Sequence, residues 1–373
     1  MYFKDIAGQT VVKQQLLDAF KKQRIPHAML FSGPEGNGKL GLAIAFARYI
    51  ACKNRTENDA CGTCPSCVKF NKLEHPDMHF VFPVVKKKGK QGISDEFVEE
   101  WRSYIIGSHY VSINGWMLQI DAENKQPIIY TEESESIVKK ANTKSYEGGY
   151  KFMIIYYPER MHLSCANKLL KLIEEPPDKT LFILVSENSD QLLTTILSRC
   201  QIINIPRIAD EELKTALLES EDIEDSGADE VVRLAGGNFV KARELISQSE
   251  ENRANLEYFI RLMRQAYGRD IVSLKQWTEE MASSGRENQK NFLNFTQRLI
   301  RENFILNLRQ EDLNYMSAEE RNFSVKFSPF VNERNVIKIY EELDLAQRHI
   351  EQNVHGKMVF FDLCLKMIML LKS

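Results

Sequence analysis

The chain has 373 residues, of which 43% are hydrophobic and 27% are charged, and its formal net charge is -3. At roughly 100–200 residues per domain, this length predicts two or three domains, each able to bury a core. The slightly negative net charge argues against a protein that binds nucleic acid over its whole surface, although a local basic face is compatible with it.

The chain contains no pattern typical of export or of membrane insertion. Its first residues lead into an amphipathic stretch and lack the apolar centre of a signal peptide. The longest apolar stretch, residues 358–371, is interrupted by Asp362 and Lys366. It is also shorter than the roughly 20 residues that a membrane span needs. We therefore expect a cytoplasmic protein.

The first 206 residues alternate between helix and strand patterns. Short apolar strands between amphipathic helices are typical of a parallel sheet with helices on both faces. We therefore predict an α/β domain over residues 1–206. In chain order, the expected elements are a helix over 11–23, a strand over 28–32, a helix over 39–51, a strand over 151–157, a helix over 164–175, and strands over 180–186 and 201–205.

After Pro206 the strand patterns disappear. Three short helices are expected over 210–219, 227–235 and 239–248, with a glycine break at 236–238. From about residue 250 the pattern is one of long amphipathic helices, with an irregular stretch at 324–329. We therefore predict a small helical domain over 207–249 and an all-α domain over 250–373.

Residues 82–125 do not fit the alternation of the first domain. They contain a lysine-rich loop at 86–92 and then a helix-like pattern with Trp101 and Tyr104. Lysine clusters bind phosphates regardless of sequence, but so short a run is more often a solvated loop. We interpret the segment as an insertion and keep phosphate contact as the alternative.

Residues 33–39 read GPEGNGK and fit the phosphate-loop pattern G-x-x-x-x-G-K between a predicted strand and a predicted helix. Gly33, Gly36 and Gly38 allow backbone N–H groups to turn toward phosphate oxygens, and the helix N-terminus favours negative charge. Lys39 is the residue expected to reach the outer phosphates. The pattern therefore predicts a nucleotide site.

Two features needed for hydrolysis are missing from this site. A magnesium-binding Ser or Thr should follow the lysine, and the chain has Leu40. An acidic residue should end the strand at 151–157, which ends in Tyr156 and Tyr157, while Glu159 comes too late. We expect a vestigial site without efficient hydrolysis; an active ATPase with unusual ligands is the alternative. Nucleotide binding stays open, because loss of turnover does not require loss of affinity.

Four of the seven cysteines, Cys52, Cys61, Cys64 and Cys67, lie within 16 residues. Thiolates at this spacing match a tetrahedral zinc site with four cysteine ligands, and a full set of protein ligands predicts a structural rather than a catalytic ion. Unliganded thiols or a redox Cys-x-x-Cys are the alternatives. Disulfides are not expected in a cytoplasmic protein. The three other cysteines are expected to be small buried residues.

Arg199 lies between a predicted helix and a predicted strand, within the sequence Ser198-Arg199-Cys200. An arginine held between rigid elements can project outward, and its fork of donors suits a phosphate of a neighbouring subunit. Such an arginine finger contributes about 10³–10⁵ in rate where it is known. Taken alone, Arg199 is more simply a surface ion-pair partner.

Together these motifs resemble the bacterial clamp-loader ATPases, the family of the gamma/tau and delta-prime subunits of DNA polymerase III. The resemblance rests on the phosphate loop, the four cysteines, Ser198-Arg199-Cys200 and residues 166–177, which read ANKLLKLIEEPP. It covers residues 1–206 and implies that this α/β domain is a P-loop domain of the AAA+ type. Three positions favour the delta-prime type: Leu40, Tyr156-Tyr157 and Val240. At the position of Val240, gamma/tau subunits carry a phosphate-sensing arginine.

The resemblance implies a non-hydrolysing subunit of the clamp loader, without intrinsic ATPase activity. Residues 207–249 would be its lid and 250–373 its part of the collar. Arg199 would reach the ATP site of an adjacent gamma/tau subunit, and the complex, which includes a delta subunit, would place the sliding clamp on primed DNA. The alternatives are an active gamma/tau-type ATPase and a zinc-stabilised module that binds nucleic acid.

Overall fold

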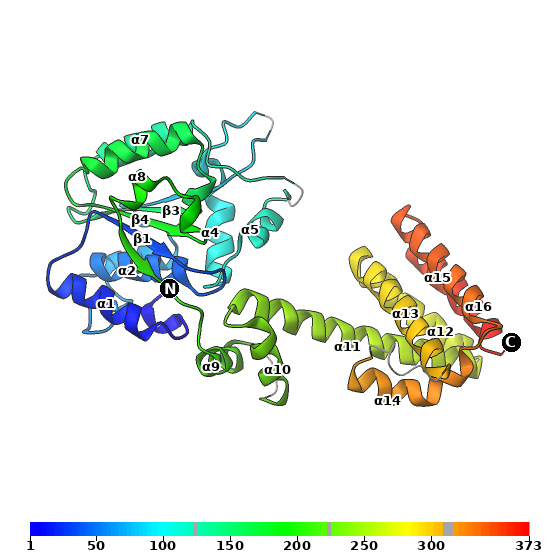
Figure 1. Ribbon diagram of the computed structural model, residues 1–373. Coiled ribbons are helices and arrows are strands. Elements are labelled where there is room, and N and C mark those ends of the chain that lie inside the picture. The colour runs from blue at the N-terminus through cyan, green and yellow to red at the C-terminus, as the bar shows by residue number, and fades with distance from the viewer. Residues whose placement is uncertain (88, 123–124, 222–224, 309–315, 373) are drawn as a thin grey trace. The chain divides into compact units, whose positions relative to one another are not determined.

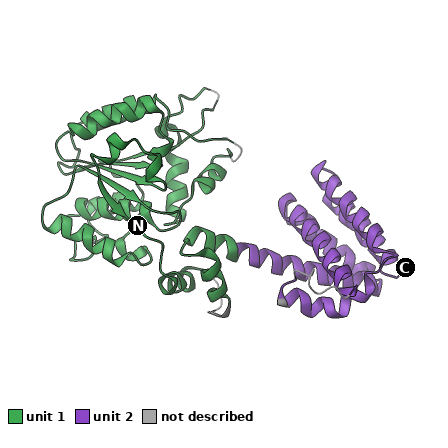
Figure 2. Ribbon diagram, viewed as in Figure 1, with its two compact units in different colours: residues 1–246 green, residues 247–373 purple. Residues whose placement is uncertain are grey.

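The computed structural model describes residues 1–87, 89–122, 125–221, 225–308 and 316–372. The chain forms two compact units, residues 1–246 and 247–373 (Figure 2). Each unit encloses hydrophobic clusters of its own. The further division of the first unit, at residue 206, stays a prediction.

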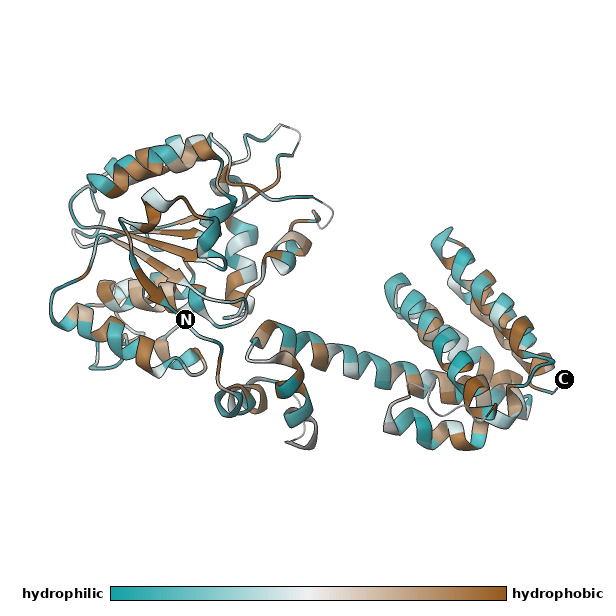
Figure 3. Cartoon of the chain, in the orientation of Figure 1, coloured by the Kyte–Doolittle hydropathy of each residue, from teal (hydrophilic) through white to brown (hydrophobic). Residues whose placement is uncertain are grey.

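The first unit is built on a sheet of five strands in the order β2-β3-β4-β1-β5, and every neighbouring pair is parallel (Figure 1). The inner strands are buried along their whole length and strongly hydrophobic (Figure 3). A strand that is apolar on both sides needs cover on both faces. The strands are β1 (Ala28–Ser32), β2 (Met78–Val81), β3 (Lys151–Tyr156), β4 (Thr180–Ser186) and β5 (Gln201–Asn204).

Helices supply this cover on both faces. One core cluster joins side chains of the sheet with α1, α2, α4 and α5, and another joins its opposite face with α6, α7 and α8. The predicted α/β architecture is therefore confirmed. The helices are α1 (Thr10–Lys21), α2 (Lys39–Ala51), α3 (Pro65–Asn71), α4 (Val98–Gly107), α5 (Ile113–Gln119), α6 (Glu133–Asn142), α7 (Leu163–Glu174) and α8 (Thr194–Leu197).

Three further helical segments, which we call the lid helices, complete the first unit: α9 (Asp210–Ser220), α10 (Asp225–Ala235) and the start of α11 (Phe239–Gly268). They share a small core that includes Leu213, Leu217 and Phe239. Tyr110, from the insertion, belongs to the same cluster. The lid helices therefore pack against the α/β part through a residue that lies about a hundred positions earlier in the chain.

The second unit is entirely helical in its described part. Its core is centred on buried side chains such as Trp277, Phe292 and Phe360. Within the described residues, no helix is long and apolar enough to cross a membrane. The helices that follow α11 are α12 (Ile271–Ser283), α13 (Arg286–Asn307), α14 (Ala318–Phe327), α15 (Val336–Glu351) and α16 (Gly356–Leu370).

Several predicted boundaries are wrong. The helix expected over 239–248 does not end there, because α11 continues to Gly268 and no glycine or proline interrupts the polar residues between. The stretch at 324–329, expected to be irregular, is helical up to Phe327 and continues as a 3₁₀ turn, Ser328–Phe330. The patterns of β2 and α6 are short and were not detected.

The insertion is a packed part of the α/β core. Trp101 and Trp116 are fully buried, and Trp101 stacks on Phe82 with ring centroids 4.2 Å apart. In the lysine-rich loop, the Nζ of Lys86 lies 2.6 Å from Glu132 and the Nζ of Lys87 donates to a backbone carbonyl. Lys88 lies outside the described residues. The insertion therefore contributes core side chains, and the phosphate contact kept as an alternative stays untested.

Candidate functional site

The glycines of the phosphate loop form one tight turn between β1 and α2. Gly36 and Gly38 adopt the left-handed region, at φ 72° and 83°, which side chains with a Cβ rarely enter. A Cβ on Gly33 would lie 2.1 Å from the carbonyl oxygen of Ile205. The sequence pattern and the backbone conformation therefore agree at each of the three glycines.

Lys39, the first residue of α2, is already engaged by protein groups. Its Nζ lies 3.4 Å from Oε1 of Glu187 and donates to the Pro34 carbonyl at 2.9 Å. The side chain is 5% exposed, and burial lowers its pKa, an effect that Glu187 opposes. A carboxylate thus occupies the position at which this lysine would meet a phosphate.

Glu187, the partner of Lys39, was not among the predicted site residues. It directly follows β4, an apolar strand that pairs with β1 in the sheet. Because parallel strands end at the same edge, a charged residue just after β4 is brought near the phosphate loop. The charged residue after an apolar strand is visible in the sequence, but only the strand order shows that it lies near the phosphate loop.

The surroundings of Lys39 are rich in carboxylates. Glu35, Glu159 and Glu187 all raise the pKa of its amine through their charge. Burial raises the pKa of Glu35, and Glu187 adds to that effect. Glu159 accepts the backbone N–H of Glu187 at 2.9 Å, so it is turned toward the end of β4. Because like charges close together are unfavourable, this site opposes a polyanion.

The two positions expected to hold magnesium are buried and uncharged. Leu40 is part of the hydrophobic core. Tyr156 is fully buried at the end of β3, and burial raises its pKa well above the usual range, so the phenol stays neutral. A hard cation such as Mg²⁺ prefers carboxylate, phosphate and water oxygens. Neither position therefore supplies a typical magnesium ligand.

Little space is left beside Lys39. The cavity at the start of α2 measures about 10 Å³, which is close to the 10–15 Å³ that one water needs. Ligand pockets usually measure about 300–1,000 Å³. A larger cavity of about 340 Å³ lies between the loop and the lid helices, lined by Glu35, Arg207 and Lys241 among others, but Lys39 is not in its lining.

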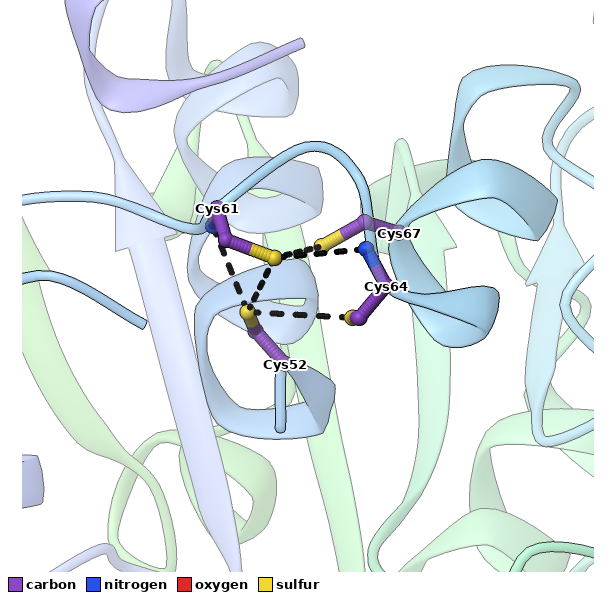
Figure 4. Close-up of side chains that lie close together, drawn as sticks. All are labelled: Cys52, Cys61, Cys64 and Cys67. Atoms are coloured by element: carbon purple, nitrogen blue, oxygen red, sulfur yellow. Dashed lines mark hydrogen bonds between the residues drawn. The ribbon is translucent and has the colours of Figure 1, made fainter. Parts of the chain in front are cut away.

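The four clustered cysteines meet as their spacing predicts (Figure 4). Their sulfur atoms lie within 4.8 Å of one another. The Sγ of Cys52 is 3.5 Å from that of Cys61 and 3.9 Å from that of Cys64, and Cys61 and Cys67 are 4.0 Å apart. Tetrahedral zinc with bonds of about 2.3 Å places its sulfur ligands about 3.8 Å apart. The geometry therefore fits a metal such as zinc.

Backbone donors favour the charged form of Cys61, whereas burial raises the pKa of Cys52 and Cys67. The N–H of Cys61 points to the sulfur of Cys52, and that of Cys64 to the sulfur of Cys61. The donor at Cys64, followed by that at Thr63, lowers the pKa of Cys61 to about 6. Buried Arg48, from α2, donates to the Cys67 carbonyl at 3.0 Å. The cluster is thereby fixed to the helix that begins at the phosphate loop.

Arg199 follows α8 and is 37% exposed. Its Nη2 lies 2.7 Å from Oε1 of Glu174, and its Nη1 donates to the Thr195 carbonyl at 3.0 Å. In the isolated chain the guanidinium is thus a surface ion-pair partner, as the simpler of the two interpretations expected. The same exposure leaves the group accessible to a second subunit, so its role as a finger stays a prediction.

Comparison with known proteins adds a family. The family model described as DNA polymerase III, delta subunit, matches residues 8–209. The chain is 26% identical over 275 residues to the DNA polymerase III subunit delta' of Bacillus subtilis strain 168, which covers 72% of this chain and 69% of that protein. Delta' of Yersinia pestis is 28% identical over 50% of this chain and 44% of its own length. The tau subunit of B. subtilis is 25% identical over 66% of this chain but only 37% of its own length.

Proposed function

This chain belongs to the family described as DNA polymerase III, delta subunit, and we propose that it is a non-hydrolysing clamp-loader subunit of the delta-prime type. The observation that carries the proposal is the state of Lys39. Its amine pairs with Glu187 inside a turn whose adjoining cavity measures about 10 Å³. In this conformation the amine is paired with a carboxylate and is not free to meet a triphosphate.

We further propose that the chain works through its neighbours. Its relatives are named as delta' and tau subunits of DNA polymerase III, which supports assembly with gamma/tau and delta subunits. Arg199 would complete the ATP site of an adjacent gamma/tau subunit, and the assembled complex would place the sliding clamp on primed DNA. The cysteine cluster would hold one structural zinc ion, and the helices of the second unit would take part in assembly.

The isolated chain is expected to show no ATP turnover in the presence of magnesium. Leu40 and Tyr156 supply no metal ligand, and the carboxylates around Lys39 oppose the triphosphate. The measurement is phosphate release by the full-length chain beside its Lys39→Ala variant, with an active P-loop ATPase assayed in parallel. Equal background rates are expected. Robust hydrolysis that disappears in the variant would instead identify an active gamma/tau-type ATPase.

Identification of the partners tests the assembly directly. The full-length chain is used as bait, and the proteins that co-purify are identified. We expect a P-loop ATPase subunit and a ring-shaped clamp among them. Recovery of neither, from cells in which the chain is expressed, would contradict a role in clamp loading.

A further inference from the structure

Residues 108–111, which belong to the link between α4 and α5, lie against the phosphate loop; we call this segment the strap. It belongs to the insertion for which sequence analysis gave no role. The strap consists of Ser108, His109, Tyr110 and Val111, and Tyr110 is 8% exposed. Its contacts lead to three parts of the first unit: the phosphate loop, the N-terminal segment and the lid helices.

Toward the phosphate loop, the strap covers the start of α2. A Cβ on Gly38 would lie 2.6 Å from the side chain of Ile6 and 3.2 Å from the ring of Tyr110. A Cβ on Gly41 would lie 2.5 Å from Ile6 and 3.2 Å from the carbonyl oxygen of His109. His109 and Val111 line the cavity of about 10 Å³ beside the loop. Backbone N–H groups at such a helix start are the part of a phosphate loop that binds anions. The strap therefore packs against the phosphate loop and the first turn of α2.

Toward the lid, the strap makes aromatic and polar contacts. The ring of Tyr110 stacks on that of Phe239, at the start of α11, with centroids 4.0 Å apart and an interplanar angle of 14°. Arg243, also on α11, donates to the hydroxyl of Ser108 at 3.0 Å. The lid touches the loop as well, because the N–H of Phe239 donates to the Gly36 carbonyl at 3.0 Å.

Toward the N-terminal segment, the hydroxyl of Tyr110 accepts the backbone N–H of Ala7 at 2.6 Å. The phenol is neutral, because burial raises its pKa to about 12. One side chain thus contacts three segments that are far apart in the sequence.

We propose that the strap is an internal substitute for nucleotide: Tyr110 packs between the phosphate loop, the N-terminal segment and the lid, and it locks the lid helices onto the phosphate loop without a ligand. The inference rests on the proposed function, in which this subunit binds no ATP of its own. It gives the insertion a role, namely to hold the first unit in one conformation while neighbouring subunits turn over ATP.

Hydrogen exchange on the full-length chain tests the lock. In Tyr110→Ala, the amides of Phe239, Lys241 and Ala242 are expected to exchange at least about tenfold faster than in the wild type, because the lid opens more often. The amides of β4 serve as the internal reference and should be unchanged. Tyr110→Phe keeps the stacked ring and should show a smaller increase. Tyr146→Ala removes a tyrosine that is 79% exposed and should show none.

Lid amides that exchange at the wild-type rate in Tyr110→Ala would overturn the lock. If that variant also loosens β4, Ser108→Ala decides. It removes the hydroxyl that accepts from Arg243 and that holds the backbone N–H and carbonyl of Tyr110, and it leaves the buried ring itself. Faster exchange confined to the lid then supports the lock, and unchanged exchange overturns it. These outcomes are independent of ATPase activity: hydrolysis by the wild-type chain would remove the proposed function, whereas unchanged lid exchange would remove the lock alone.

Discussion

Replacement of Arg199 by alanine is expected to slow ATP hydrolysis by about 10³-fold or more at the single site that it completes in a reconstituted complex. Arg199→Lys should recover little, because an ammonium lacks the fork of donors that spans two phosphate oxygens. The measurement is single-turnover hydrolysis, since intact sites on other subunits would hide the defect in the steady state. Assembly is followed by gel filtration and should be unchanged.

Glu174→Gln is the matched control for Arg199. It removes the same ion pair, whose N–O distance is 2.7 Å, but leaves the arginine in place. Because both partners are partly exposed, the loss of this pair should change the free energy of unfolding by less than about 1 kcal/mol. Normal hydrolysis in the Arg199→Ala complex would contradict the finger assignment. A defect of equal size in Glu174→Gln would instead assign the effect to the ion pair.

Loss of the metal is expected to produce the largest change in stability. The purified chain should contain one zinc per molecule, and Cys61→Ser should abolish it. Removal of a structural metal belongs to the few changes that cost about 3–5 kcal/mol. For a unit of this size, that loss corresponds to a fall in melting temperature of roughly 6–20 °C. Arg48 of α2 donates to the carbonyl of Cys67 in the cluster. Because α2 begins at the phosphate loop, loss of the metal should also destabilise that loop.

Cys200→Ser is the control for this experiment. Cys200 is buried but distant in sequence from the cluster and belongs to the core on the other face of the sheet, so its variant should keep a full equivalent of zinc. A chelator should lower the melting temperature of the wild type and leave that of Cys61→Ser unchanged. A wild-type chain that contains no zinc and has the same melting temperature as Cys61→Ser would contradict a structural metal.

Local patterns in the sequence were sufficient for much of this protein. Glycine spacing specified the turn at 33–39, and the cysteine spacing brought four sulfurs together, because each constellation is contained in a short segment. Four of the five strands were detected because they are apolar runs of strand length. The residue types at positions 40 and 156 are by themselves enough to question hydrolysis, because neither side chain is a usual magnesium ligand.

Patterns failed where the outcome depends on partners far away in the chain. The end of the third lid helix was misplaced, because polar residues around 248 are equally compatible with a surface helix and a linker. The strand β2 was missed, because four residues carry too little periodicity. The insertion was given no place in the core, although Trp101 and Trp116 pack into it.

The conformation of the phosphate loop was determined by the local sequence, and the side chains that contact it were decided by the tertiary structure. No local pattern pairs Lys39 with Glu187, which lies 148 positions later, or places Tyr110 on Phe239. Those contacts exist because the parallel strands bring their carboxyl ends to one edge and the lid helices pack over it. A turn is encoded by residues that are neighbours in sequence, whereas the side chains that pack against it come from segments that meet only on folding.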